Sequence, residues 1–287
     1  MLYAQACGKN SLRDVETGLN VHFNFHYHLG LTSVSRSTIA HANSRRDFRI
    51  FEGLFYRLLE KCRDITPARK FRFKNPLHTL DSTVIDLCLE LFPWATFRQT
   101  KGAIKIHTFF NNRTQIPEFL VVTDAQQHDL KVARNYELPF SRDSILVLDK
   151  AYFDLRWLYS LACRGVFFVT RAKDNLNYTV IGQHKPSTNS ACLEDNIIEL
   201  VNYNSKQKYP EKLRRIEWVD KETGQILVFL TNNFDFAAST IAGIYKARWQ
   251  VEIFFKWIKQ NLKIKTFLGT SENAVKTQIW IAMIYYL

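Results

Sequence analysis

The residues whose types and spacing are most suggestive of chemistry lie between Tyr245 and Lys259. Placed on a helix at about 100° per residue, the polar side chains of this segment fall within roughly one third of the circumference. They are Tyr245, Arg248, Trp249, Glu252, Lys256 and Lys259. Glu252 is the only acid from Ala242 to Thr266, where six residues are lysine or arginine. A lone carboxylate in a basic stripe suits a site where a divalent metal takes the carboxylate and the cations take nucleic-acid phosphates.

A second interpretation of the same segment is a basic surface helix with one stray glutamate. Both interpretations require an amphipathic helix, and the remaining positions supply its apolar side. These positions are Ala247, Val251, Ile253, Phe254, Trp257 and Ile258. The pattern by itself does not decide between the two.

The order and spacing of Tyr245, Arg248, Glu252 and Lys259 resemble a known signature. It is that of bacterial insertion-sequence transposases of the DDE type, in the family called IS four. The resemblance implies a ribonuclease H-like α/β fold with a mixed sheet. It also implies a catalytic trio of Asp, Asp and Glu, so that two aspartates should lie upstream on strands.

The first of these aspartates is expected at Asp81. The segment from Pro76 to Asp86 is rich in apolar and β-branched residues and predicts a strand with Asp81 in its middle or at its exit. A carboxylate in such a strand is costly to bury unless it is paired or binds a metal. The tripeptide Asp81-Ser82-Thr83 resembles the family's first catalytic block.

The second aspartate is expected at Asp149. The apolar run Ile145–Leu148 predicts a central strand covered on both faces, and it ends at Asp149. Ligands of open α/β sheets gather beyond the carboxyl ends of strands. The residues after Asp149 resemble the family's second block, although Ala151 stands where the family commonly has glycine.

Three other aspartates compete for this assignment. Asp124 also ends an apolar strand, and the physics of the residues does not separate it from Asp149; the resemblance favours Asp149. Asp86 and Asp129 are expected in loops or helix caps.

By resemblance, Asp81, Asp149 and Glu252 hold Mg²⁺ or Mn²⁺, with two ions in the site. Water first cuts the DNA at the element end, and the freed 3′-hydroxyl then attacks target DNA. Arg248, Lys256 and Lys259 are expected on phosphates, and Tyr245 could donate a hydrogen bond to one. Trp249 has two interpretations, stacking on a displaced base and packing within the protein.

The composition of the whole chain agrees with a nucleic-acid partner. It contains 39 Lys and Arg against 27 Asp and Glu, a formal charge of +12 with a pI near 9.5, and 14% aromatic residues. The five cysteines form no C-x-x-C pair, which indicates a reducing compartment and argues against structural zinc. No apolar run reaches the roughly 18 residues of a membrane span. These features indicate a cytoplasmic protein with no membrane partner, and the resemblance implies a bacterial, nucleoid-associated protein that binds double-stranded DNA as a homodimer in the DNA complex.

Residues 1–75 are predicted to form a small helical region that binds DNA. Helices are expected from Ser11 to Gly18, over 35–43 and over 48–62, an arrangement compatible with a helix-turn-helix-like reader. The cationic candidates are Arg45, Arg46, Arg49, Arg69, Lys70 and Arg72. His22, His26 and His28 could be considered as metal ligands, but nothing supplies a fourth, and an ordinary structural role is favoured.

Residues 76–287 are predicted to form the ribonuclease H-like catalytic domain. Short strand-like runs with turn signals between them fill 166–231, and the gap of 103 residues from Asp149 to Glu252 leaves room for the mostly β insertion known in the family.

The ends of the chain suggest a truncated transposase of doubtful activity. The apolar helix predicted over 275–287 has no polar C-cap, as expected if the chain is cut within that helix. Loss of the segment that would follow is expected to expose Trp280, Ile281, Ile284 and Tyr285 to water. Two alternatives to an active transposase therefore remain. One is a non-catalytic DNA-binding remnant, and the other is a ribonuclease H-like nuclease that cuts without joining.

Overall fold

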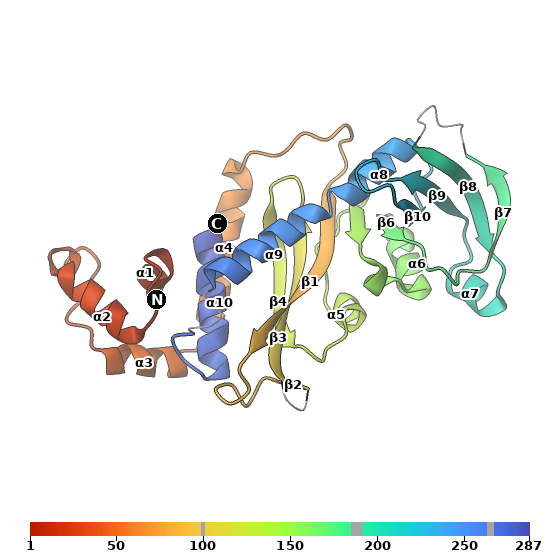
Figure 1. Cartoon of the computed structure of the whole chain (residues 1–287). Coiled ribbons are helices and arrows are strands. Elements are labelled where there is room, and N and C mark those ends of the chain that lie inside the picture. The colour runs from red at the N-terminus through yellow and green to blue at the C-terminus, as the bar shows by residue number, and fades with distance from the viewer. Residues whose placement is uncertain (99–100, 185–190, 263–266) are drawn as a thin grey trace.

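The computed structural model describes residues 1–98, 101–184, 191–262 and 267–287 (Figure 1). Its α-helices are α1 (Leu2–Ala6), α2 (Leu12–Val21), α3 (Arg36–Arg45), α4 (Arg49–Ile65), α5 (Asp129–Asn135), α6 (Leu155–Cys163), α7 (Tyr203–Lys208), α8 (Ala238–Lys246), α9 (Trp249–Asn261) and α10 (Glu272–Tyr286). Its strands are β1 (Leu77–Leu87), β2 (Thr96–Arg98), β3 (Lys101–Asn111), β4 (Ile116–Asp124), β5 (Ile145–Leu148), β6 (Phe167–Arg171), β7 (Tyr178–Gln183), β8 (Cys192–Leu200), β9 (Leu213–Val219) and β10 (Ile226–Thr231). The 3₁₀ helices are η1 (Phe23–Phe25) and η2 (Lys150–Tyr152). The strands form one mixed sheet in the order β2-β3-β1-β5-β6-β10-β9-β8-β7, with β4 on the free side of β3.

The strands that carry the predicted aspartates sit in the middle of this sheet. β3 pairs antiparallel with β1 and β4, whereas β5 pairs parallel with β1 and β6 pairs parallel with β5. Three antiparallel strands followed by two parallel ones are the ribonuclease H-like arrangement, so the predicted fold class is confirmed. Leu80 lies opposite Leu148 in the register of β1 and β5. The residues that follow them, Asp81 and Asp149, are therefore neighbours across two adjacent strands.

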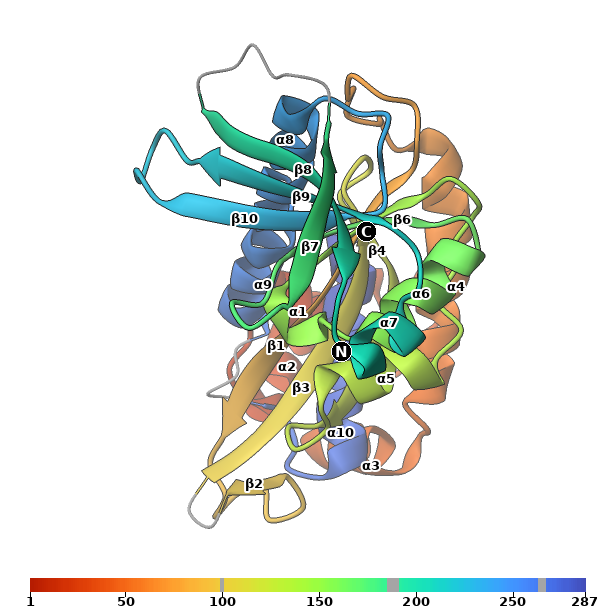
Figure 2. The same cartoon turned by 90° about the vertical axis from the view of Figure 1, so that its right-hand side faces the viewer.

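Helices cover both faces of these strands, and Figure 2 shows α5 and α6 on one side and α9 on the other. Successive side chains of a strand point to opposite faces. On β1, Leu80 packs in a core with α5 and α6, whereas Ile85 packs in a core with α4, α9 and α10. By this alternation Asp81 faces the α9 side and Ser82 faces the α5 side.

The far half of the sheet continues from β6 through β10, β9, β8 and β7 by antiparallel pairing. A fully buried arginine stabilises it. Arg214 donates two hydrogen bonds of 2.7 Å to Asp195 and one of 2.5 Å to the carbonyl of Phe236. Within the predicted insertion, 166–231, β6 pairs directly with the core strand β5, and residues 185–190 lie outside the described part. The division of the chain into two domains with an insertion stays a prediction.

The three predicted helices of residues 1–75 correspond to α2, α3 and α4, and α1 precedes them. The side chain of Ser11 caps α2 by accepting a hydrogen bond from the backbone N–H of Asp14. The expectation that this helix ends at Gly18 is wrong, because α2 runs on to Val21. A glycine within a helix lowers its stability by only about 1 kcal/mol relative to alanine. The packing of Val15 with Ala4 in a small core offsets this loss.

Helix α10 packs against α1, α3 and α4. The expected exposure of Trp280 and Ile281 is therefore wrong: each is 2% exposed, and the Trp280 ring lies 5.4 Å from that of Phe55 in α4. Ile284 is partly buried, and Tyr285 is 46% exposed as predicted. Within the described residues, no helix combines the length and the apolar character needed to cross a membrane.

Replacing Trp280 with alanine tests whether α10 holds the helical layer on the sheet. We expect the Trp280→Ala variant to lose about 3–5 kcal/mol of unfolding free energy, because a fully packed indole leaves a cavity. Urea unfolding followed by circular dichroism measures this loss. Trp249→Ala is the matched control, since Trp249 is 61% exposed and should change stability by less than about 0.5 kcal/mol. Equal effects of the two changes would contradict the packing described here.

Candidate active site

One guanidinium joins two of the predicted catalytic carboxylates. Arg248 donates from Nη1 to Oδ2 of Asp81 at 2.8 Å and from Nη2 to Oε1 of Glu252 at 2.5 Å. The side chains of Asp81, Arg248 and Glu252 are 15%, 18% and 33% exposed. This partly buried charge cluster brings together residues that are 167 positions apart in the chain.

A tight turn between α8 and α9 places Arg248. The single helix predicted over 245–259 is wrong in this detail, because α8 ends at Lys246 and α9 begins at Trp249. The backbone N–H of Val251 bonds to the carbonyl of Arg248, three residues back, as in a 3₁₀ turn. Buried Asn112, which follows β3, donates to the carbonyl of Ala247 at 2.8 Å and so fixes the turn against the sheet.

Asp149 completes the group of three carboxylates. It ends β5, and its side chain accepts a hydrogen bond of 2.7 Å from the backbone N–H of Lys150 at the start of η2. The pKa of Asp81 is raised to about 6, mainly by burial and also by the negative charges of Asp149 and Glu252, although the Ser82 N–H and Arg248 oppose the rise. The three acids therefore share one electrostatic neighbourhood.

The other face of β1 holds a second polar network. Asp129, the first residue of α5, accepts a hydrogen bond of 2.6 Å from the hydroxyl of Ser82. Lys105 and His107 of β3 lie 3.5 and 3.4 Å from the same carboxylate oxygen. Burial lowers the pKa of His107 to about 4, so the ring is neutral at pH 7. Asp129 thus ties α5 to the residue next to Asp81, beyond the cap role expected for it.

Nothing in the sequence around Asp129 or Asn112 points to these supporting roles. Their partners come from other elements, far away in the chain. Only the strand pairing and the helix packing bring them together.

The remaining residues of the predicted stripe lie on both helices. On α8, the Tyr245 ring packs against Phe229 with centroids 5.0 Å apart, and the Arg248 guanidinium lies 5.9 Å from the centre of the Tyr245 ring. Lys256 and Lys259 are exposed on α9. Two further cations of the predicted basic stripe, at positions 263 and 265, lie outside the described residues.

The predicted cations of the N-terminal region are all exposed and fall into two groups. Arg45, Arg46 and Arg49 lie around the end of α3 and the start of α4. The second group, Arg69, Lys70 and Arg72, lies in the connection from α4 to β1. The 17 residues of α4 separate the groups by about 25 Å.

The rival aspartates lie elsewhere. Asp124 is exposed at the end of β4, opposite Ile104, which in turn pairs with Ile85, four residues along β1 from Asp81. Asp86 is exposed on β1. Neither is among the main influences on the pKa of Asp81.

The chemistry of the three carboxylates fits a hard divalent cation, because Mg²⁺ and Mn²⁺ prefer carboxylate oxygens. Across residues 1–98, 101–184, 191–262 and 267–287, no three His, Cys, Asp or Glu side chains are already grouped as metal ligands, the N-terminal histidines included. At Asp81 and Glu252, one oxygen of each carboxylate accepts a hydrogen bond from the guanidinium of Arg248.

Comparisons with known proteins identify the family. Residues 74–287 match the family described as Transposase DDE domain. A protein of Sinorhizobium fredii assigned as transposase y4zB is 33% identical over 258 residues, covering 88% of this chain and 70% of that protein. A protein of Geobacillus stearothermophilus assigned as the transposase for insertion sequence element IS5377 is 31% identical over 263 residues, covering 90% of this chain and 67% of that protein.

A solved structure of the piggyBac transposase synaptic complex with hairpin DNA aligns over 99% of this chain and 64% of that chain, with a TM-score of 0.46 and 12% identity. The family match and the two relatives above 30% identity agree with the motif resemblance at Tyr245, Arg248, Glu252 and Lys259. The chain therefore belongs to the DDE-type transposases of bacterial insertion sequences.

Proposed function

We propose that this transposase cuts the ends of an insertion sequence and joins them to target DNA with Asp81, Asp149 and Glu252 as its catalytic carboxylates. The Arg248 bridge supports this choice, because it draws a strand residue and a helix residue of like charge onto one cation. Asp149 belongs to the same group through its electrostatic effect on Asp81. Asp124 is exposed at the end of β4 and is not among the main influences on Asp81, so it is not favoured as the second aspartate.

Bound Mg²⁺ or Mn²⁺ would be held by these three carboxylates and would stabilise the charge that develops on the phosphate and the leaving oxygen. A water oxygen attacks the phosphorus at the element end, and the bond to the leaving oxygen breaks to free a 3′-hydroxyl. That hydroxyl then attacks a target phosphodiester in the same way.

Side chains around the carboxylates position the DNA. Once Arg248 leaves its carboxylates, its fork can donate two hydrogen bonds to a phosphate. Lys256 and Lys259 attract the backbone as exposed point charges, and Tyr245 borders the same turn. Trp249 is 61% exposed, which favours its stacking on a displaced base over its packing in the core.

The DNA partner is double-stranded, and the two N-terminal groups of cations offer it phosphate contacts in addition to those on α9. We place the protein in the bacterial cytoplasm, on the nucleoid when bound, and we infer that two copies act together in the DNA complex. Residues 1–75 serve as the DNA-binding region and 76–287 as the catalytic domain.

Neutral isosteres test the three carboxylates. Asp81→Asn, Asp149→Asn and Glu252→Gln should each reduce nicking of an end-containing duplex by more than about 100-fold, the upper end of what losing an outer-shell partner costs a metal site. DNA binding measured by mobility shift should remain. Asp124→Asn is the control and should keep wild-type nicking.

The alternatives predict other outcomes for the same assays. DNA binding by the unaltered chain without any nicking would indicate a DNA-binding remnant, whereas nicking unaffected by all three changes would mean that these carboxylates are not the catalytic ones. Nicking without joining of a supplied 3′-hydroxyl end would indicate a nuclease. A stronger loss in Asp124→Asn than in Asp149→Asn would mean that the second aspartate is misassigned.

Arg248 should compete with the metal. In Arg248→Gln the oxygens of Asp81 and Glu252 lose their cationic partner, so Mn²⁺ binding without DNA should tighten by about tenfold, or about 1.4 kcal/mol. Nicking should fall at the same time, because the phosphate loses its fork. The Mn²⁺ spin-resonance signal measures binding independently of activity.

Lys256→Gln is the matched control for that experiment, since it removes one charge from an exposed position on the same helix. It should leave Mn²⁺ binding unchanged. Weaker Mn²⁺ binding in Arg248→Gln than in the wild type would show that Arg248 orders the carboxylates rather than competing for them.

The salt dependence of DNA affinity tests the N-terminal cations. The logarithm of the binding constant should fall steeply with the logarithm of salt concentration, by about 0.9 for each phosphate contact. Changing Arg69, Lys70 and Arg72 to Gln should make the slope shallower, and so should changing Arg45, Arg46 and Arg49. A flat response of the unaltered chain would remove the phosphate interpretation of its +12 charge.

A further inference from the structure

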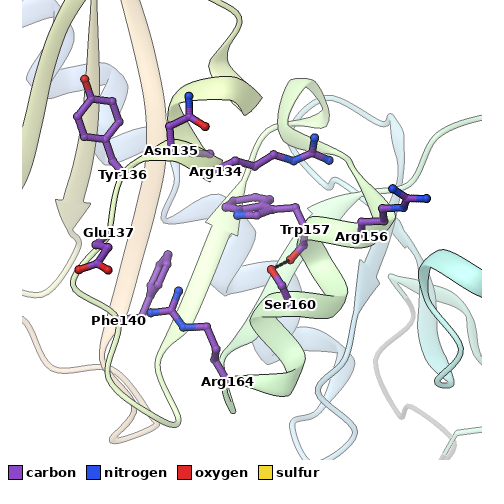
Figure 3. A pocket seen from close by; sticks show the side chains of 10 residues that line it. Arg134, Asn135, Tyr136, Glu137, Phe140, Arg156, Trp157, Ser160 and Arg164 are labelled. Atoms are coloured by element: carbon purple, nitrogen blue, oxygen red, sulfur yellow. Dashed lines mark hydrogen bonds between the residues drawn. The ribbon is translucent and has the colours of Figure 1, made fainter.

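A second basic site lies on the α5–α6 side of the sheet, the side opposite α9. An open cavity of about 560 Å³ lies between the end of α5, the segment that follows it, and α6. Figure 3 shows three arginines, Arg134, Arg156 and Arg164, arranged around Trp157 at this cavity. We call it the α5–α6 groove.

The three guanidinium groups differ in how far they are already paired. Arg134 forms an ion pair with Asp154, which caps α6. Arg164 lies over the ring of Phe140, 5.0 Å from its centre, and its guanidinium forms no ion pair or hydrogen bond with a described residue. The exposed side chain of Arg156 likewise forms none with any residue that the structure describes. Two of the three cations are therefore available to an anion.

The rest of the lining selects the kind of anion. Glu137 is the one acid among the lining residues. Trp157 is 6% exposed, and the hydroxyl of Ser160 donates to the carbonyl of Trp157 at 2.7 Å. The indole is thus closed to stacking with a base. An open, polar, cationic groove is unlike the enclosed apolar pockets that bind small molecules, and it suits an extended polyanion.

The spacing of the two available cations fits a nucleic-acid backbone. Arg156 lies in the first turn of α6 and Arg164 at its C-cap, eight residues later. Eight residues of helix rise about 12 Å, which equals the axial length of three to four nucleotides of one DNA strand at about 3.4 Å each. One backbone following α6 would therefore place separate phosphates beside Arg156 and Arg164.

The groove is also linked to the candidate active site. Its α5 begins at Asp129, which binds the hydroxyl of Ser82, the neighbour of Asp81. Its α6 is capped by Asp154, five residues after Asp149. A duplex in the groove would therefore pass beside the elements that hold the carboxylates, on the side of the sheet that α9 leaves free.

We propose that the α5–α6 groove binds the phosphate backbone of a DNA duplex without reading its sequence, through Arg156 and Arg164, with Arg134 kept in place by Asp154. This second duplex site rests on the proposed DNA chemistry. It gives the transposase a DNA contact separate from the α9 surface. Such a second contact is needed when one molecule must hold an element end and target DNA at the same time.

The test compares the 287-residue chain with its Arg156→Gln/Arg164→Gln variant on a random-sequence duplex. Losing two phosphate contacts should make the slope of log affinity against log salt shallower by about 1.8. The control is Lys212→Gln/Lys221→Gln, which removes the same charge from exposed positions outside the groove and should keep the slope. Equal slopes for the two double variants would overturn the proposal.

Three further measurements guard against misfolding and a different partner. Arg156→Lys/Arg164→Lys keeps both charges and should restore most of the slope, whereas a loss equal to that of the Gln variant would assign the arginines a structural role. A benzophenone amino acid incorporated in place of Ser160, which is exposed in the groove, should crosslink to the duplex without labelling the exposed Cys7, Cys88 and Cys163. If polyglutamate displaces the duplex from the groove as effectively as unlabelled DNA does, the groove binds acidic protein and the DNA proposal is overturned.

These readouts measure binding alone. A chain that binds through the groove but fails to nick DNA would therefore count against the proposed catalysis and leave the groove intact.

Discussion

Like charges that must stay close are the constraint on which this structure depends. Asp81, Asp149 and Glu252 repel one another and are partly shielded from water, which is why the pKa of Asp81 is raised. A single guanidinium, held between Asp81 and Glu252, offsets that repulsion. The strand pairing, the α8–α9 turn and the packing of α9 all serve to bring these groups within reach of one another.

Strand β1 couples the two faces of the sheet at this point. Asp81 points to the α9 side and Ser82 to the α5 side, where Asp129 accepts a hydrogen bond from the Ser82 hydroxyl. Asn112 supports the same region from β3 by binding the turn before Arg248. A shift of α5 or of the turn would therefore be transmitted to the carboxylates through hydrogen bonds and not only through apolar packing.

Much of this arrangement could be predicted from the sequence. The apolar run before Asp149 and the periodic charges around Glu252 are local patterns, and local patterns fix where strands and helices form. The break at Arg248 could not be predicted, because it depends on Asn112, which is distant in the chain. The burial of Trp280 could not be predicted either, because α4 and α10 are far apart in the chain and pack together only in the folded protein.

The pairing of β6 with β10 has a consequence for how this fold can change. Arg171 lies opposite Phe229, and the N–H of Ala172 bonds to the carbonyl of Val228. The chain thus leaves β6 at 171 and returns to it at Phe229, so the two ends of the segment between them lie side by side. Insertions and deletions are tolerated at exposed backbone, whereas Ile198, Leu200 and Leu213 of this segment are buried in the same core as Leu148. Its exposed turns can therefore vary during evolution, while the strands that pack on that core constrain it.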